Sequence, residues 1–102
     1  MDFSIDKLLA YTLESGASDL HLSAGSIPMV RIHGDMKKLD LPKLEEAQIQ
    51  RIADQVLNPN QRKLFDENLE IDFSTQLEDR GRFRVNIFQQ LKGVSAVFRT
   101  IP

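Results

Sequence analysis

Apolar and polar residues alternate strictly along residues 82–87 of this chain. Successive side chains of a β-strand point to opposite faces of the sheet, so the alternation predicts a strand with one buried face. The residues predicted to face the core are Phe83, Val85 and Ile87. The residues predicted to face outward are Arg82, Arg84 and Asn86. The two arginines would lie roughly 6–7 Å apart, at two residue rises along the strand.

Two guanidinium groups at that spacing repel each other unless water, carboxylates or a bound anion compensates their charges. The planar fork of donors on arginine also matches the geometry of phosphate. Arg82 and Arg84 therefore allow two interpretations. One is a solvated strand face with surface partners, and the other is a binding site for an anion. The candidate surface partners are Glu70, Asp72 and Glu78.

Other segments of the chain show the same alternation and are also predicted to be strands. They are residues 17–23, 29–33, 36–39, 70–77 and 94–101, and the strand described above is predicted to extend over 82–90. Turn-forming residues separate neighbouring strands at Gly34-Asp35, at residues 78–81 and at Lys92-Gly93. The chain therefore contains about six strands.

Helical spacing of apolar residues predicts helices over residues 4–15, 44–57 and 59–68. Ser4 is placed to cap the first helix at its N-terminus, and Gly16 is placed to end it. Phe3 and Leu8 occupy the positions of a hydrophobic staple around that cap.

The second and third predicted helices meet at Asn58-Pro59. Asn58 is a suitable N-cap, and Pro59 is favoured at the first helical position because its missing N–H is not needed there. The third helix is predicted to bury Leu64 and Phe65.

The predicted order is α-β-β-β-α-α-β-β-β, an α+β fold in which helices cover one face of an antiparallel sheet of about six strands. A chain of 102 residues suits one domain with one core. The opposite face of the sheet would carry Asp19, His21, Arg31, His33, Arg82, Arg84 and Arg99. A sheet face this polar must meet either water or another domain.

Composition narrows the choice of function. Hydrophobic residues make up 41% of the chain and charged residues 27%, as in ordinary globular domains. The net charge of −2 gives no general basic field for nucleic acid or for a membrane surface. The absence of cysteine excludes disulfides and thiolate metal sites, and no apolar run approaches the roughly 20 residues that span a bilayer. The acidic start lacks the basic residues of a signal peptide, so we expect neither secretion nor membrane insertion.

The sequence contains no motif for catalysis. A Walker A stretch, a dinucleotide-binding glycine motif, a Gly-x-Ser-x-Gly elbow and a His-Glu-x-x-His pair are all absent. Asp19, His21 and His33 are too few to predict a metal site, and Glu70 with Asp72 fit charge balance for the arginines better than acid–base chemistry. We therefore expect this chain alone to be no enzyme, to hold no metal and to bind no nucleic acid.

An ordered set of short motifs is similar to the start of the type IV pilus retraction ATPases, the PilT-like motors. The motifs are Ala17–Gly25, Pro28–Arg31, Gly34-Asp35, Asn60–Lys63, Arg82–Asn86 and Ala96–Pro102. Each motif is weak alone, but together they cover essentially the whole chain in the family order.

This resemblance implies that residues 1–102 form the N-terminal PAS-like domain of a two-domain ATPase of the secretion ATPase superfamily. The RecA-like C-terminal domain, with its Walker motifs, would follow the linker that begins at Thr100-Ile101-Pro102. Such proteins are implied to be cytoplasmic homo-hexamers at the inner-membrane base of the pilus machine. They use ATP and Mg²⁺ to drive pilus retraction and twitching motility.

The resemblance also implies a role for three arginines. ATP would lie in the cleft between the two domains, with Arg82, Arg84 and Arg99 approaching its phosphates from the N-terminal sheet. The fragment alone would need no cofactor. Its partners would be its own and neighbouring RecA-like domains and the pilus base. Asp19 and His21 match the family stretch Ser-Asp-Leu-His and are expected to shape the sheet or the interface between domains.

Alternative functions remain at this stage. The chain could be a stand-alone PAS-like sensor or ligand-binding module, which would need an internal cavity for a small molecule. It could also be the equivalent domain of a pilus assembly or type II secretion ATPase, or of a PilU-like accessory paralogue. A Walker A sequence in the following coding stretch would exclude the sensor.

Overall fold

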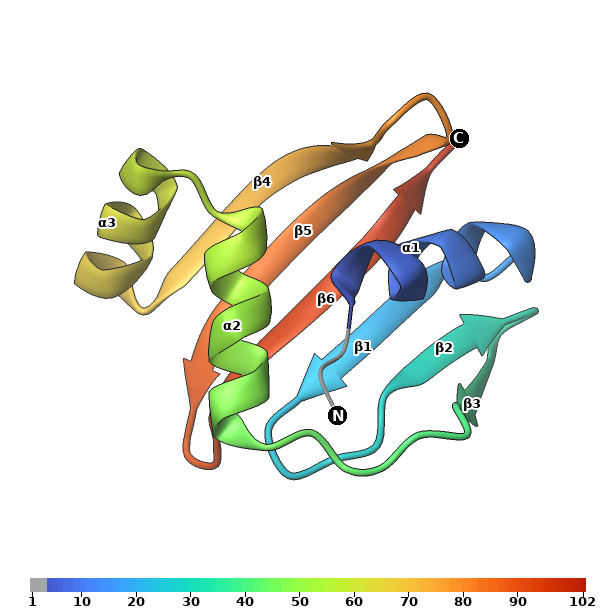
Figure 1. The fold of residues 1–102 in the computed structure, drawn as a ribbon, viewed down its shortest axis with the longest axis horizontal. Coiled ribbons are helices and arrows are strands. Elements are labelled where there is room, and N and C mark those ends of the chain that lie inside the picture. Colours follow the sequence, from blue (N-terminus) through green and yellow to red (C-terminus); the bar gives the residue numbers. More distant parts are fainter. Residues whose placement is uncertain (1–3) are drawn as a thin grey trace.

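The computed structural model describes residues 4–102, so the predicted contact between Phe3 and Leu8 lies outside the described residues. The strands are β1 Asp19–Ser23, β2 Met29–Ile32, β3 Asp35–Lys38, β4 Glu70–Leu77, β5 Gly81–Gln90 and β6 Gly93–Ile101. The helices are α1 Ile5–Glu14, α2 Glu46–Val56 and α3 Pro59–Asn68. This order confirms the predicted α+β class (Figure 1).

The strands form one antiparallel sheet in the order β3-β2-β1-β6-β5-β4. Two three-stranded meanders, β1–β2–β3 and β4–β5–β6, are joined where β1 pairs with β6. Figure 1 shows these two strands side by side at the centre of the sheet, although they come from opposite ends of the chain. Residues near both ends of the sequence therefore meet in the middle of the sheet.

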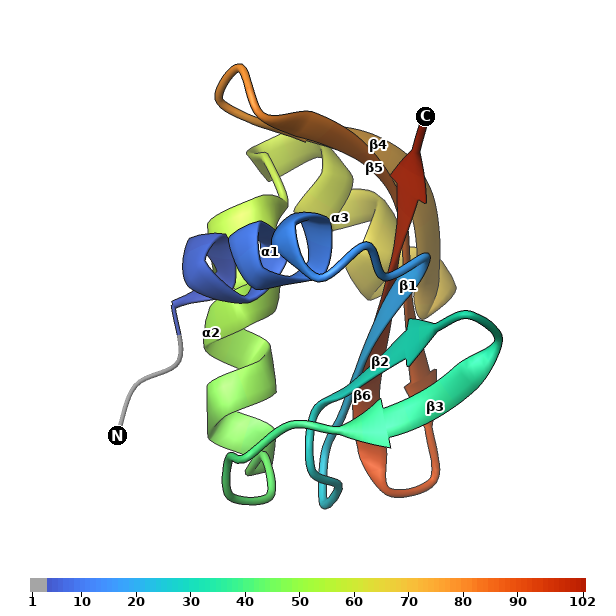
Figure 2. The same ribbon diagram turned by 90° about the vertical axis from the view of Figure 1, so that its right-hand side faces the viewer.

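All three helices lie on one face of the sheet (Figure 2). α1 packs on β1, α2 on β6 and α3 on β4. Between these layers lies the core, which contains the predicted inward row of β5 together with Phe98 of β6, all fully buried. Within residues 4–102, no helix covers the opposite face of the sheet (Figure 2). This uncovered face carries the outward side chains that the alternation predicted, with the exception of His33.

The helix ends confirm most of the predicted capping. Ser4 accepts a hydrogen bond from the backbone N–H of Lys7, and Gly16 has the positive φ of 73° that its place after α1 required. Asn58 caps α3 through the N–H of Gln61, whose side chain accepts the Asn58 N–H in return.

The predicted start of α2 was two residues too early. The helix begins at Glu46, because Glu45 forms a capping box with Gln48 that fixes the N-terminus there. Leu44 lies before the helix and is nevertheless buried in the core.

The predicted turn at Gly34-Asp35 was wrong by one residue. His33 and Gly34 form the turn, with φ values of 51° and 84°, and Asp35 already pairs with Ile32. Positive φ at both positions is the requirement of a type I′ hairpin turn. His33 is therefore a turn residue and does not belong to the outward row of a strand.

Two further boundaries also differ from the sequence prediction. Gly81 and Gly93 are the first residues of β5 and β6, so that the β5–β6 turn consists of Leu91 and Lys92.

Leu64, which was predicted to be buried, is 49% exposed, because α3 lies at the edge of the sheet and buries only its Phe65 side. Within residues 4–102, none of the helices has the length and apolar character needed to cross a membrane.

Candidate anion site on the uncovered sheet face

Charged residues on the uncovered face line up across neighbouring strands. In the register of the sheet, Asp19 of β1 lies between Arg31 of β2 and Arg99 of β6. Arg99 in turn lies directly opposite Arg84 of β5. Side chains directly opposite on antiparallel strands have Cβ atoms about 4.5–5.5 Å apart. The structure therefore brings two of the three predicted phosphate-contacting arginines into direct cross-strand contact distance.

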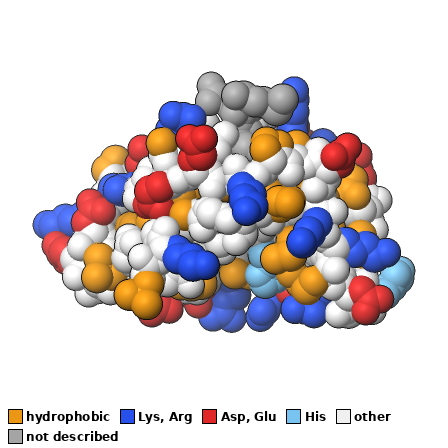
Figure 3. All heavy atoms as spheres, turned by 90° about the horizontal axis from the view of Figure 1, so that it is seen from below, with side chains coloured by type: hydrophobic (Ala, Val, Ile, Leu, Met, Phe, Trp, Pro, Cys, Tyr) orange, Lys and Arg blue, Asp and Glu red, His pale blue; other side chains and the backbone are white. Residues whose placement is uncertain are grey.

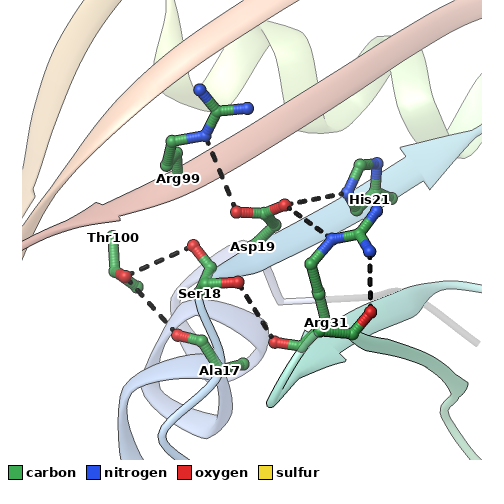
Figure 4. A network of polar contacts seen from close by, with 8 residues as sticks. Ala17, Ser18, Asp19, His21, Arg31, Arg99 and Thr100 are labelled. Carbon is green, nitrogen blue, oxygen red and sulfur yellow. Dashed lines mark hydrogen bonds and ion pairs between the residues drawn. The ribbon is translucent and has the colours of Figure 1, made fainter.

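Asp19 contacts two arginines and a histidine at the centre of this face (Figure 4). One carboxylate oxygen accepts from Arg31 Nε at 3.3 Å and lies 3.4 Å from His21 Nε2. The other oxygen lies 3.6 Å from Arg99 Nε. The Asp19 side chain is only 10% exposed, because the surrounding arginines cover it. A carboxylate placed in this way is a structural counter-charge that fixes the direction of its neighbours.

The contact with Asp19 leaves part of the Arg99 guanidinium unused. Only Nε faces the carboxylate, and the two terminal nitrogens point away from it (Figure 4). The Arg99 side chain is 67% exposed. Its free terminal donors can therefore reach an anion in front of the sheet.

Arg84 has a partner on its other side, at β4. Arg84 Nε donates to Asp72 Oδ1 at 3.2 Å, and Nη2 donates to Asp72 Oδ2 at 3.1 Å. Asp72 is thus the surface partner that the sequence offered as one of three candidates. This hydrogen bonding is the main cause that lowers the pKa of the Asp72 carboxyl from its ordinary value of 3.8, with smaller contributions from the charges of Arg84 and Arg99. The same pair raises the pKa of Arg84.

The charged row borders a hollow in the sheet surface of about 370 Å³. It is lined by His21, Asp72, Arg84, Asn86, Val97 and Arg99. In Figure 3, which views the molecule from below, Lys and Arg side chains gather along the lower margin, on the side away from the helices. The hollow is open to solvent and has guanidinium groups on its wall, so its chemistry suits an anionic ligand.

Arg82 lies outside the hollow. It follows the same face of β5 as Arg84 but stands one row further along, opposite Ile101 of β6 and Gln76 of β4. Within residues 4–102 its side chain makes no hydrogen bond or ion pair, and it is exposed. Arg82 can reach an anion only if the ligand extends beyond the hollow toward the end of β5.

The residues weighed as metal ligands, Asp19, His21 and His33, are not gathered into a metal site, and Glu70, weighed for acid–base chemistry, has a structural partner. His21 lies beside Asp19, whereas His33 belongs to the β2–β3 turn. Glu70 accepts a hydrogen bond from the Asn86 amide at 3.3 Å. Across the described part of the chain, no group of three or more His, Cys, Asp or Glu side chains is placed to hold a metal ion.

Sequence reasoning missed the central place of Asp19. The alternation identified it as an outward residue, which correctly gives its face but not its burial. Its arginine partners come from β2 and β6, and only the pairing of β1 with both strands brings them together. The signal that could have found it is the run of complementary charges, since Arg31, Asp19 and Arg99 all occupy outward positions of strands.

The arrangement supports binding of an anion more than chemistry on it. Among the described residues, no serine, cysteine or lysine lines the hollow. Its arginines are permanently charged donors. Such groups can hold and stabilise a charged ligand that another part of a protein reacts with.

Comparison with known proteins shows similarity to motor proteins of pili. The chain is 51% identical over 98 residues to the type IV pilus retraction ATPase PilT of Pseudomonas aeruginosa, covering 96% of this chain and 28% of that protein. It is 47% identical over 75 residues to a twitching motility protein of Neisseria gonorrhoeae, covering 74% of this chain and 20% of that protein. The type IV pilus ATPase PilU of P. aeruginosa is 35% identical over 96 residues, covering 94% of this chain and 25% of that protein.

A solved structure has the same fold. The crystal structure of the pilus retraction motor PilT with bound ADP superimposes with a TM-score of 0.90 at 39% identity, covering 99% of this chain and 30% of that one. These coverages show that the chain spans less than a third of the length of each of these four proteins. A scan against models of protein families found no match.

Proposed function

We propose that this chain, which is similar over nearly its whole length to type IV pilus retraction ATPases, is the N-terminal PAS-like domain of such a motor. The relatives are more than three times as long as the match, which supports a parent protein with a second, RecA-like ATPase domain. In this proposal the fragment itself does not hydrolyse ATP. Its task is to pack against ATPase domains and to present arginines to the phosphates of bound ATP.

The observation that carries the proposal is the cross-strand pair of Arg84 and Arg99 beside an open hollow. Two like charges held side by side favour a ligand with several negative charges, because such a ligand compensates both. Polyphosphate chains of nucleotides meet that requirement. The PilT structure with the same fold contains ADP, which supports a nucleotide as the ligand of the parent protein.

The donors present fit phosphate oxygens. Arg99 has two terminal nitrogens that do not face Asp19, and Arg84 retains Nη1 beyond its contact with Asp72. ATP supplies the transferable phosphoryl group, and Mg²⁺ would accompany its phosphates. Arg82 would join Arg84 and Arg99 where the triphosphate extends past the hollow.

The uncovered sheet face gives this role a mechanical consequence. With the cleft open, Arg84 and Arg99 face water, and with the cleft closed they would face phosphate. Electrostatic attraction therefore favours closure of the cleft between the two domains only when the RecA-like domain carries the nucleotide. In this way the nucleotide state would set the angle between the two domains, which is the movement that a motor needs.

The remaining parts of the proposal concern the parent assembly. We propose a homo-hexamer in the cytoplasm, at the inner-membrane base of the pilus machine, whose N-terminal domains contact their own and neighbouring ATPase domains. Identity favours a retraction motor over an accessory paralogue, because the match to PilT is 51% and that to PilU of the same organism is 35%.

The test has two steps. The coding sequence that follows this chain should contain a Walker A motif, and its absence would reject the motor. In the parent protein, Arg84→Ala should lower kcat for ATP hydrolysis more than it weakens ring assembly, measured on the same preparation by steady-state turnover and by sedimentation. Full turnover in that variant would reject the phosphate contact of Arg84.

A further inference from the structure

Asp72 stands in an unusual place for a site that binds anions. It lines the same hollow as Arg84 and Arg99, and its two oxygens take two of the donors of Arg84. A carboxylate on the wall of such a site repels an incoming anion and neutralises the arginine nearest to it. Its presence therefore opposes the binding for which the arginines are suited.

The other aspartate of this face makes a useful contrast. The Asp19 side chain is 10% exposed and lies between Arg31 and Arg99, so it cannot turn toward solvent without losing its contacts with both arginines. The Asp72 side chain is 49% exposed and contacts a single arginine, whose side chain is 67% exposed. Water can solvate both groups when they separate, so this pair can exchange its partner at little cost.

We propose that Asp72 is a built-in competitor for the anion, and that it makes the site selective for polyphosphates over anions of low charge. A small anion such as sulfate that replaces the carboxylate at Arg84 gains contacts to that one arginine and remains beside the displaced negative charge. A chain of phosphates bridges Arg84 and Arg99 at once and relieves their mutual repulsion. Only the second exchange is favourable overall.

The charge state of the competitor does not change under physiological conditions. Because Arg84 lowers the pKa of the Asp72 carboxyl, the group stays ionised well below neutral pH. Release of Arg84 therefore depends on a ligand of sufficient charge and not on protonation. The inference concerns the site named in the proposed function and rests on it for the identity of the physiological ligand.

The experiment compares this 102-residue chain with three variants, using inorganic tripolyphosphate and inorganic sulfate as probes at low salt. Binding is followed by the NMR signals of the Arg84 and Arg99 Nε–H groups. Asp72→Asn is the test variant, and Arg84→Gln should abolish the response. Asp66→Asn is the matched control, because Asp66 forms an exposed ion pair with Arg62 at 3.2 Å on α3, away from the uncovered face, and its loss changes the net charge equally.

The inference predicts that Asp72→Asn binds tripolyphosphate roughly two- to fivefold more tightly than the Asp66→Asn control, as expected for loss of an exposed ion pair. It also predicts a larger relative gain for sulfate, so that selectivity falls. Equal affinities in the two variants, weaker binding by Asp72→Asn, or no response of Arg84 and Arg99 in any protein would each overturn it. None of these results would reject the proposed function, which is decided by turnover of Arg84→Ala in the parent protein.

Discussion

Arg84 and Arg99 lie directly opposite each other in the β5–β6 ladder, with both side chains on the face that no helix covers. Each is held from its outer side by a carboxylate: Arg99 by Asp19 on β1, and Arg84 by Asp72 on β4. Four adjacent strands therefore carry the charge order negative, positive, positive, negative. Like charges directly opposite on a sheet are destabilising, and the flanking carboxylates offset that effect. The sheet keeps the two cations together where an anion can reach both.

The buried carboxylate in this series should matter for folding. Asp19→Asn removes the charge that Arg31 and Arg99 share, so we expect a loss of about 1–2 kcal/mol in the free energy of unfolding. Urea denaturation followed by circular dichroism measures it. Asp35→Asn is the control, since Asp35 is exposed on the edge strand β3, and it should change stability by less than about 0.5 kcal/mol. Equal stabilities of the two variants would show that the Asp19 charge is not structural.

The Asp72–Arg84 pair predicts a measurable titration. In the wild-type chain the pKa of the Asp72 carboxyl should lie below 3.8, and Arg84→Gln should return it toward that value. Arg99→Gln should move it less, because Arg99 acts only through its charge at a distance. Carbon-detected NMR titration of the aspartate carboxyls gives all three values. A normal pKa in the wild-type chain would mean that the pair is not formed in solution.

The lowered pKa of the Asp72 carboxyl also determines how the stability of the fold depends on pH. A carboxyl whose pKa is lower in the folded state stabilises that state above the unfolded-state value near 3.8, and this contribution is lost as the pH falls through the folded-state value. The difference in stability between wild type and Asp72→Asn should therefore be constant near neutral pH and shrink in acid. A difference that grows in acid would contradict the assignment.

The local features of this fold could be read from the sequence because their causes are local. Alternation with period two gave the faces of β5, and capping residues such as Asn58 gave the start of α3. The hairpin turn was misplaced because His33-Gly34 and Gly34-Asp35 both contain the glycine that a turn requires. Only the pairing of Ile32 with Asp35 distinguishes them.

The anion site could be predicted only in part, because its residues come from strands that are distant in sequence. The two-residue spacing placed Arg82 beside Arg84, whereas the structural neighbour of Arg84 is Arg99 on β6. The position of β6 between β1 and β5 creates that contact and also buries Asp19. Strand order of this kind results from packing of the whole domain, and no short motif specifies it.

Both the backbone conformation and the limited space at position 93 require glycine. Its φ is 127°, and an added Cβ would overlap a Glu46 carboxylate oxygen and lie 3.0 Å from the Ala24 Cβ. Glu46 could move, but it would then lose the hydrogen bond that it accepts from the Val94 N–H at 3.2 Å. Gly93→Ala should therefore lower the free energy of unfolding by about 3 kcal/mol or more, from backbone strain and the lost contact together.

The control for this prediction is Gly25→Ala. Gly25 has a φ of 83°, but no atom beyond its chain neighbours lies within 4 Å of an added Cβ, so only the left-handed backbone costs stability, by about 1–2 kcal/mol. Thermal and urea denaturation of both variants separates the two effects. If the variants were equally destabilised, crowding of the added Cβ and loss of the hydrogen bond between Val94 and Glu46 would not contribute.

The three arginines should contribute unequally to turnover in the parent protein. Arg84 and Arg99 line the hollow, whereas Arg82 stands one row outside it. We expect Arg84→Gln and Arg99→Gln each to lower kcat for ATP hydrolysis by at least about tenfold, as for loss of a donor that stabilises transition-state charge. Arg82→Gln should have a smaller effect, because its guanidinium reaches only a ligand that extends past the hollow. Circular dichroism must show the same fold in all three variants. A defect of Arg82→Gln as large as that of Arg84→Gln would place the phosphates toward the end of β5 and away from the hollow.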